Sequence, residues 1–142
     1  MCIVINNLYF NGRKINMNDM IKLKRWAILG ATNDESKFSY KIFESMEKRG
    51  YMVYPVNPKY NLIDGIKVFN SIEELPKIVD GIIMVVSPKV SLISLDKIKE
   101  KGIKNVWFQP GSFNEEVINK AQQLEFNIEN KLCIYKQLEG LI

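Results

Sequence analysis

Four short segments of the sequence combine glycine, proline and polar residues, and each follows an apolar stretch. They are Gly30-Ala31-Thr32-Asn33, Asn57-Pro58-Lys59, Ser87-Pro88 and Gln109-Pro110-Gly111. Glycine permits close approach of a ligand to the backbone, hydroxyl and amide groups form hydrogen bonds, and lysine attracts anions. These residue types favour the binding of a phosphate-bearing ligand.

The segment at Gly30 has the features of a phosphate cradle. A helix that starts after it would present free backbone N–H groups and the positive end of its dipole to an anion. Thr32, Asn33 and Ser39 add polar side chains, and Lys37 adds a positive charge within reach. A plain strand-to-helix turn with a serine cap is the alternative interpretation.

The loop does not carry the dinucleotide fingerprint G-x-G-x-x-G, because Gly30 is the only one of the three glycines that is present. NAD sites also place an acidic residue after the second strand, where this sequence has Lys59. A lysine there suits an additional phosphate, such as the 3′-phosphate of coenzyme A (CoA) or the 2′-phosphate of NADP. A solvated surface lysine is the alternative.

Three other positions allow two interpretations each. Ser87-Pro88 suits contact with an adenine or a pantetheine arm, or simply ends a strand. Trp107 and Phe108 are expected in the core rather than at a ligand. Cys133 is either a buried apolar residue or a neighbour of a ligand thiol.

The chain has no histidine, which excludes imidazole as a base, phosphate carrier or metal ligand. Ser-His-Asp and Cys-His catalysis are therefore excluded. Tyr40 and Lys37 lie near the first loop and leave the proton relay of an NADP-dependent oxidoreductase as an alternative. Two separated cysteines make neither a disulfide framework nor a zinc site.

The formal net charge of +4 fits an anionic ligand, but no dense Lys/Arg stripe indicates nucleic acid. No apolar run reaches about 18 residues, so we expect no membrane span. The N-terminus lacks the layout of a signal peptide. We therefore expect a cytoplasmic protein.

The pattern of elements predicts one α/β domain with a parallel sheet and helices on both faces, that is, a Rossmann-like three-layer fold. Strands are expected over 25–29, 51–56, 66–69, 82–86, 106–108 and 126–128. Helices are expected between them, one capped by Ser36 or Ser39 and ended by Gly50, one at the capping box Ser71–Glu74, one from Val90 to Lys101, one at the capping pair Ser112 and Glu115, and a short one in the tail.

Residues 1–24 form an N-terminal extension and a lead-in helix, and residues 25–142 form the domain. Residues 1–16 hold Ile3-Val4-Ile5 and are an edge strand, a tail or a stretch before a later start at Met17 or Met20. Asn18 is the predicted cap of the lead-in helix.

From Arg25 onward the sequence resembles the CoA-binding domain family, the small stand-alone relatives of the N-terminal domain of the succinyl-CoA synthetase alpha subunit. The resemblance lies in the order and spacing of the strings AILGATND, KFSY, YMVYPVNPK, GIKVFNSIEELP, VDGIIMVV, GIKNVWFQPG and NKLCI. It implies a Rossmann-like fold that binds CoA or an acyl-CoA at the carboxyl edge of its sheet.

The resemblance also implies which residues contact the ligand. The phosphates would be held by Gly30, Ala31, Thr32, Asn33, Lys37 and Ser39. The adenosine end would lie against Pro58 and Lys59, with Lys59 near the 3′-phosphate. The site would be lined further by Val86, Ser87 and Pro88.

One departure from the synthetase bears on activity. The synthetase forms a phosphohistidine in a second domain, whereas this chain has no histidine and no second domain. We therefore expect binding without catalysis and no metal. The alternatives are an NADP-binding oxidoreductase, a ligase-like subunit active only in a complex, or an interaction protein with a vestigial site.

Overall fold

The chain folds around a central parallel sheet in the computed structural model, which describes residues 9–10, 13–14 and 17–140. The strands lie in the order β4-β3-β7-β8-β9. They span Arg25–Leu29 (β3), Met52–Val56 (β4), Gly81–Met84 (β7), Asn105–Phe108 (β8) and Asn127–Glu129 (β9). Neighbouring strands of this sheet are parallel, which confirms the predicted fold class.

Side chains of the central strands alternate between two separate apolar cores. Ala27, Met84 and Phe108 belong to one core, whereas Trp26 and Trp107 belong to the other. Successive side chains of a strand point to opposite faces, so both faces of the sheet are buried and each needs a helical layer. Trp107 and Phe108 are fully buried, as predicted.

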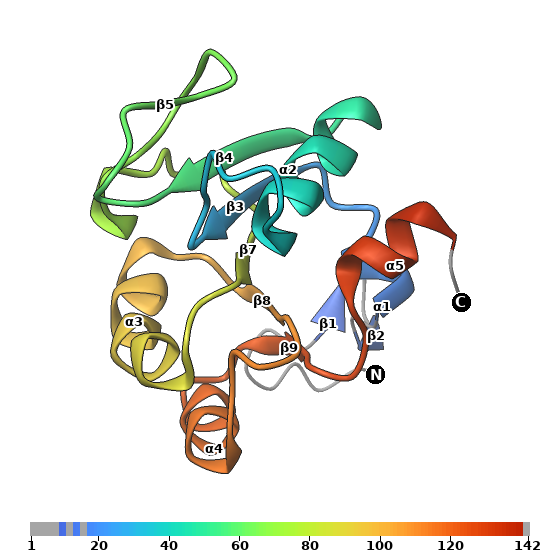
Figure 1. Cartoon of the computed structure of the whole chain (residues 1–142). Coiled ribbons are helices and arrows are strands. Elements are labelled where there is room, and N and C mark those ends of the chain that lie inside the picture. Colours follow the sequence, from blue (N-terminus) through green and yellow to red (C-terminus); the bar gives the residue numbers. More distant parts are fainter. Residues whose placement is uncertain (1–8, 11–12, 15–16, 141–142) are drawn as a thin grey trace.

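Helices cover both faces of the sheet. They span Phe38–Lys48 (α2), Pro88–Lys101 (α3), Glu115–Gln123 (α4) and Ile134–Glu139 (α5), with a 3₁₀ turn at Ile72–Glu74 (η1). Figure 1 shows α3 with α4 on one side and α2 with α5 on the other. In the described ranges, no helix combines the length and hydropathy that crossing a bilayer requires.

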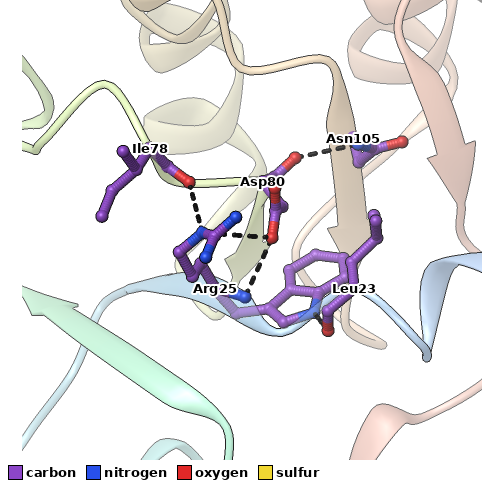
Figure 2. A network of polar contacts seen from close by, with 6 residues as sticks. Leu23, Arg25, Ile78, Asp80 and Asn105 are labelled. Carbon is purple, nitrogen blue, oxygen red and sulfur yellow. Dashed lines mark hydrogen bonds and ion pairs between the residues drawn. The ribbon is translucent and has the colours of Figure 1, made fainter.

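A polar network joins the amino ends of β3, β7 and β8 (Figure 2). Asp80 accepts a hydrogen bond from the backbone N–H of Arg25 at 3.0 Å, and its own N–H donates to the Arg25 carbonyl at 2.7 Å. The Arg25 side chain donates to the Ile78 carbonyl, and Asn105 donates to the Asp80 carbonyl. These contacts hold the three strands in register at the edge opposite the predicted site.

The predicted capping pair Ser112 and Glu115 is wrong. Asn114 caps α4 instead, because its side-chain oxygen accepts a hydrogen bond from the Val117 N–H at 3.0 Å. The Ser112 hydroxyl donates to the Gln109 carbonyl at 2.7 Å and is buried. The Ser112 hydroxyl is therefore bonded within the turn that follows β8 and does not cap the helix.

The predicted short strand over 66–69 is observed only at Ile66–Lys67 and pairs outside the central sheet, although Phe69 forms an isolated parallel bridge with Val56 of β4. Leu62–Ile63 (β5) and Ile66–Lys67 (β6) form an antiparallel pair. The turn between them is the predicted Asp64-Gly65, whose φ angles of 50° and 79° fold the chain back into a hairpin.

The N-terminal elements are separate from the central sheet. They are Tyr9–Phe10 (β1), Arg13–Lys14 (β2) and Met17–Met20 (α1). β1 and β2 pair with each other, so neither is the predicted edge strand of the central sheet. The segment Ile3-Val4-Ile5 lies outside the described residues. Asn18 lies within α1, so its prediction as a helix cap is wrong.

Candidate functional site

The carboxyl ends of four central strands are in register. Leu29 in β3 pairs with Val56 in β4 and with Met84 in β7, and Met84 pairs with Phe108 in β8. The segments that follow these residues therefore emerge at one edge. β3 has β4 on one side and β7 on the other, so the chain runs outward from β3 in both directions and the strand order reverses there. Open parallel sheets bind ligands at such a switch point. The fold thus brings the four predicted segments to one edge.

Gly30 lies directly against the exit of β7. Its φ is +95°, and a Cβ at this position would lie 2.3 Å from the Val85 carbonyl oxygen and 2.9 Å from Cγ1 of Val86. On the other side, the N–H groups of Gly30 and Ala31 donate to the Val56 carbonyl at 3.2 and 3.3 Å. The loop is therefore held by both neighbouring strands, in a space that only glycine fits.

Asn57, to which no role was assigned from the sequence, connects the first two segments. Its Nδ2 donates to the Ala31 carbonyl at 2.8 Å, and its Oδ1 accepts from the Lys59 N–H at 2.8 Å. One side chain thus positions the exposed pair Pro58 and Lys59 relative to the glycine loop. The place of Asn57 directly after a strand was the only sequence feature that pointed to it.

Among the described residues, no side chain caps the first turn of α2. Lys37 occupies the cap position and forms no side-chain hydrogen bond there. By contrast, Ser87 caps α3 and Asn114 caps α4. An uncapped helix start presents backbone N–H groups and a positive dipole end, both of which suit an anion.

Ser36 and Ser39, the predicted caps of α2, occupy other positions. The N–H and hydroxyl of Ser36 donate to Oδ1 of Asp34 at 3.0 and 2.6 Å, and Ser39 is buried in the first turn. The hydrogen bonds from Ser36 lower the pKa of Asp34 below its usual range, and the charge of Lys37 acts in the same direction. At neutral pH the loop therefore carries an ionised carboxylate beside a lysine.

Thr32 and Asn33 differ in how they lie in the loop. Oγ1 of Thr32 accepts a hydrogen bond from the Asp34 N–H at 3.1 Å and shares another with the Tyr60 hydroxyl at 3.2 Å. Asn33 is exposed. Thr32 therefore holds the shape of the loop, whereas the Asn33 side chain faces solvent, where a ligand would approach.

Ser87 caps the helix that follows β7. Its Oγ accepts a hydrogen bond from the Val90 N–H at 3.3 Å, and α3 begins at Pro88, two residues before the predicted start at Val90. Proline is favoured at the first helical position, where its missing N–H costs nothing. Val86 lies next to Gly30, so this segment borders the glycine loop.

Tyr40 lies in α2 beside the turn of the β5–β6 hairpin. Its hydroxyl donates to the Asp64 carboxylate at 2.6 Å, and this hydrogen bond raises the pKa of Tyr40 to about 12. A proton relay with Lys37 would require the hydroxyl to release its proton, which the neighbouring carboxylate opposes. The geometry gives the oxidoreductase alternative no support.

Tyr40→Phe should reduce stability at neutral pH, because it leaves the Asp64 carboxylate without this donor. A phenol whose pKa is raised on folding stabilises the native state below its ordinary pKa of 10.0, and this contribution is lost as pH rises towards about 12. Denaturant unfolding at pH about 8 and about 11 measures the effect. The difference in free energy of unfolding between wild type and Tyr40→Phe should shrink at the higher pH. A difference that stays constant would contradict the hydrogen bond from Tyr40 to Asp64 as the cause of the raised pKa.

Comparison with protein families matches residues 24–139 to the family described as CoA binding domain. The alpha subunit of acetate–CoA ligase (ADP-forming) II from Pyrococcus furiosus is 38% identical over 90 residues, which are 63% of this chain. The chain spans only 20% of that subunit, so the likeness concerns one domain of it.

Two other relatives consist of little beyond this domain. The uncharacterized protein YneT from Bacillus subtilis is 26% identical over 87% of this chain and 93% of its own length. The structure of a conserved hypothetical protein from Pyrococcus furiosus superposes with a TM-score of 0.78 at 36% identity, covering 80% of this chain and 98% of that one. This domain therefore occurs both within large ligases and nearly alone.

Proposed function

We propose, on the premise that the chain belongs to the CoA-binding domain family, that it binds CoA or an acyl thioester of CoA at the carboxyl edge of its sheet and catalyses no reaction of its own. The observation that carries the proposal is the uncapped start of α2 at the end of the loop that begins at Gly30. Backbone N–H groups there can donate hydrogen bonds to a pyrophosphate in place of a side-chain cap.

The residues at this edge fit the charges of CoA. The pyrophosphate would lie on Gly30, Ala31 and Asn33 with Lys37 beside it. Lys59, held through Asn57 on the β4 side, would meet the 3′-phosphate. On the β7 side, the segment of Val86, Ser87 and Pro88 would border the part of the ligand beyond the pyrophosphate.

The side chains available support the proposal of binding without catalysis. The sequence has no histidine, so it cannot carry a phosphohistidine. The Tyr40 hydroxyl, a candidate proton donor near the loop, is engaged by Asp64. The ligase relatives support a second candidate, a subunit that presents CoA to a separate catalytic protein. Both candidates require the same CoA site.

Thermal unfolding with CoA, acetyl-CoA, dephospho-CoA, NAD and NADPH tests the proposal. A ligand at about 100 times its Kd stabilises the fold by about 2.7 kcal/mol, which raises Tm by several degrees in a domain of this size. We expect a clear shift with CoA, a smaller one with dephospho-CoA and none with NAD. No shift with CoA would refute the proposed ligand, and a shift with NADPH alone would favour the oxidoreductase.

Lys59→Ala should remove the preference for CoA over dephospho-CoA. Loss of one charge-assisted contact with the 3′-phosphate should weaken CoA about tenfold and leave dephospho-CoA nearly unchanged. Lys104→Ala is the matched control, since it removes an exposed lysine next to the amino end of β8, at the opposite edge. Titration calorimetry of both variants with both ligands gives the comparison. Equal losses for the two ligands would show that Lys59 does not contact the 3′-phosphate.

A further inference from the structure

A cavity of about 270 Å³ lies beyond the carboxyl ends of β7 and β8. Its walls come from four parts of the chain: the start of α2, the exits of both strands, and α5. The lining residues are Phe38, Val85, Gln109, Pro110, Cys133 and Lys136. α5 lines the cavity because it packs beside α2. The rings of Phe38 and Tyr135 meet edge to face there, with their centroids 5.9 Å apart.

The cavity adjoins the glycine loop at Val85. Val85 lines the cavity, and its carbonyl is the atom that a Cβ on Gly30 would strike. Phe38, which also lines the cavity, is the first residue of α2 and directly follows the cap position Lys37. An anion on the first turn of α2 would therefore lie next to the cavity.

The order of the strands places three parts of the proposed binding site one after another along this edge. Lys59 follows β4, the glycine loop follows β3, and the cavity lies beyond β7 and β8. Neighbouring strands lie about 4.8 Å apart, so the distance from β4 to β8 is roughly 14 Å. A ligand with its 3′-phosphate at Lys59 and its pyrophosphate at Gly30 would direct its other end, which carries the sulfur, towards the cavity.

The volume and the lining of the cavity indicate what it can hold. Pockets that enclose a whole drug-sized ligand measure about 300–1,000 Å³, so this one fits only part of a CoA thioester. Phe38, Val85 and Pro110 make the wall mainly apolar. The Gln109 amide is already engaged, since its Oε1 accepts from the Ile134 N–H at 2.8 Å and its Nε2 donates to Sγ of Cys133 at 3.2 Å.

We propose that this cavity receives the sulfur end of the ligand together with a short acyl group, so that the protein's ligands are short-chain acyl thioesters of CoA. This inference rests on the proposed function and deepens it. An apolar wall close to the thioester strengthens binding with each methylene of the acyl group that it covers. The small volume of the cavity limits the length of the acyl chain that it can cover.

Alkylation of Cys133 by iodoacetamide reports directly on the cavity, in a Cys2→Ser background that leaves one cysteine in the sequence. Acetyl-CoA is compared with adenosine 3′,5′-bisphosphate, which has the nucleotide end but no pantetheine arm. Each probe is first shown to bind by thermal unfolding. At about ten times Kd, acetyl-CoA should slow alkylation about tenfold, because roughly a tenth of the sites stay free. The bisphosphate should leave the rate unchanged.

The outcomes separate the two proposals. A thermal shift with acetyl-CoA but no protection of Cys133, or equal protection by both probes, would overturn the cavity assignment and leave CoA binding intact. The absence of any thermal shift would refute CoA binding and the cavity assignment with it.

Filling the cavity gives an independent measurement. Cys133→Leu adds volume inside it, whereas Cys133→Ser keeps the volume nearly constant and is the matched comparison. The leucine variant should bind acetyl-CoA about tenfold more weakly than the serine variant, and both should bind adenosine 3′,5′-bisphosphate equally. Equal acetyl-CoA affinities in two folded variants would contradict the proposal.

Discussion

Gly30→Ala is expected to destabilise the protein by about 3 kcal/mol, from a left-handed backbone cost of about 1 kcal/mol and a steric cost of about 2 kcal/mol. The backbone cost arises because φ is +95° at this position. The steric cost arises because the new Cβ would lie 2.3 Å from the Val85 carbonyl oxygen, which belongs to the backbone and cannot rotate away. Denaturant unfolding measures the loss.

Gly50→Ala separates the two costs. Gly50 also has a positive φ, +85°, but a Cβ there would meet no atom within 4 Å. Its substitution should therefore cost only about 1 kcal/mol. Equal losses at Gly30 and Gly50 would show that contact with Val85 does not constrain the loop. CoA affinity should fall in the Gly30 variant alone, since only that loop lies at the proposed site.

Asn57→Ala is expected to lower both stability and affinity for CoA. It removes two hydrogen bonds, to the Ala31 carbonyl and from the Lys59 N–H, each of which contributes about 1 kcal/mol. Stability should fall by about 2 kcal/mol. The glycine loop and the Lys59 turn would then no longer be pre-positioned, so CoA should bind about tenfold more weakly.

Asn57→Asp tests which of the two bonds matters. A carboxylate can still accept from the Lys59 N–H but cannot donate to the Ala31 carbonyl, and it adds negative charge beside the proposed phosphate site. We expect this variant to retain part of the stability and to lose more affinity than the alanine variant. Unfolding and calorimetry on the same samples give both quantities. Unchanged CoA affinity in Asn57→Ala would show that this side chain does not position the site.

Much of the fold follows from local sequence patterns. The apolar runs at 25–29 and 82–86 predicted central strands; the observed β3 matches the first run, and β7 (Gly81–Met84) overlaps the second but begins one residue earlier and ends two residues earlier. Gly102 predicted the end of a helix, and α3 ends there in the left-handed conformation that glycine favours. These patterns are reliable because they depend on residues within a few positions of one another.

The location of the candidate site also followed from the sequence, because the carboxyl ends of parallel strands must share one edge. The resemblance to CoA-binding domains rested on the order and spacing of several short motifs, and the family match over residues 24–139 confirms it. The roles of the individual residues at the site stay predictions that the experiments above test.

Tertiary structure decided which polar groups meet. Ser112 fits a helix-capping pattern, but its hydroxyl bonds to Gln109 and leaves Asn114 to cap α4. Asn57 bonds to Ala31 across 26 positions, and Gln109 bonds to Cys133 across 24. Such contacts depend on strand order, on register and on where α5 packs. No local periodicity encodes these distances, so the link at Asn57 and the cavity at Cys133 became visible only in the folded chain.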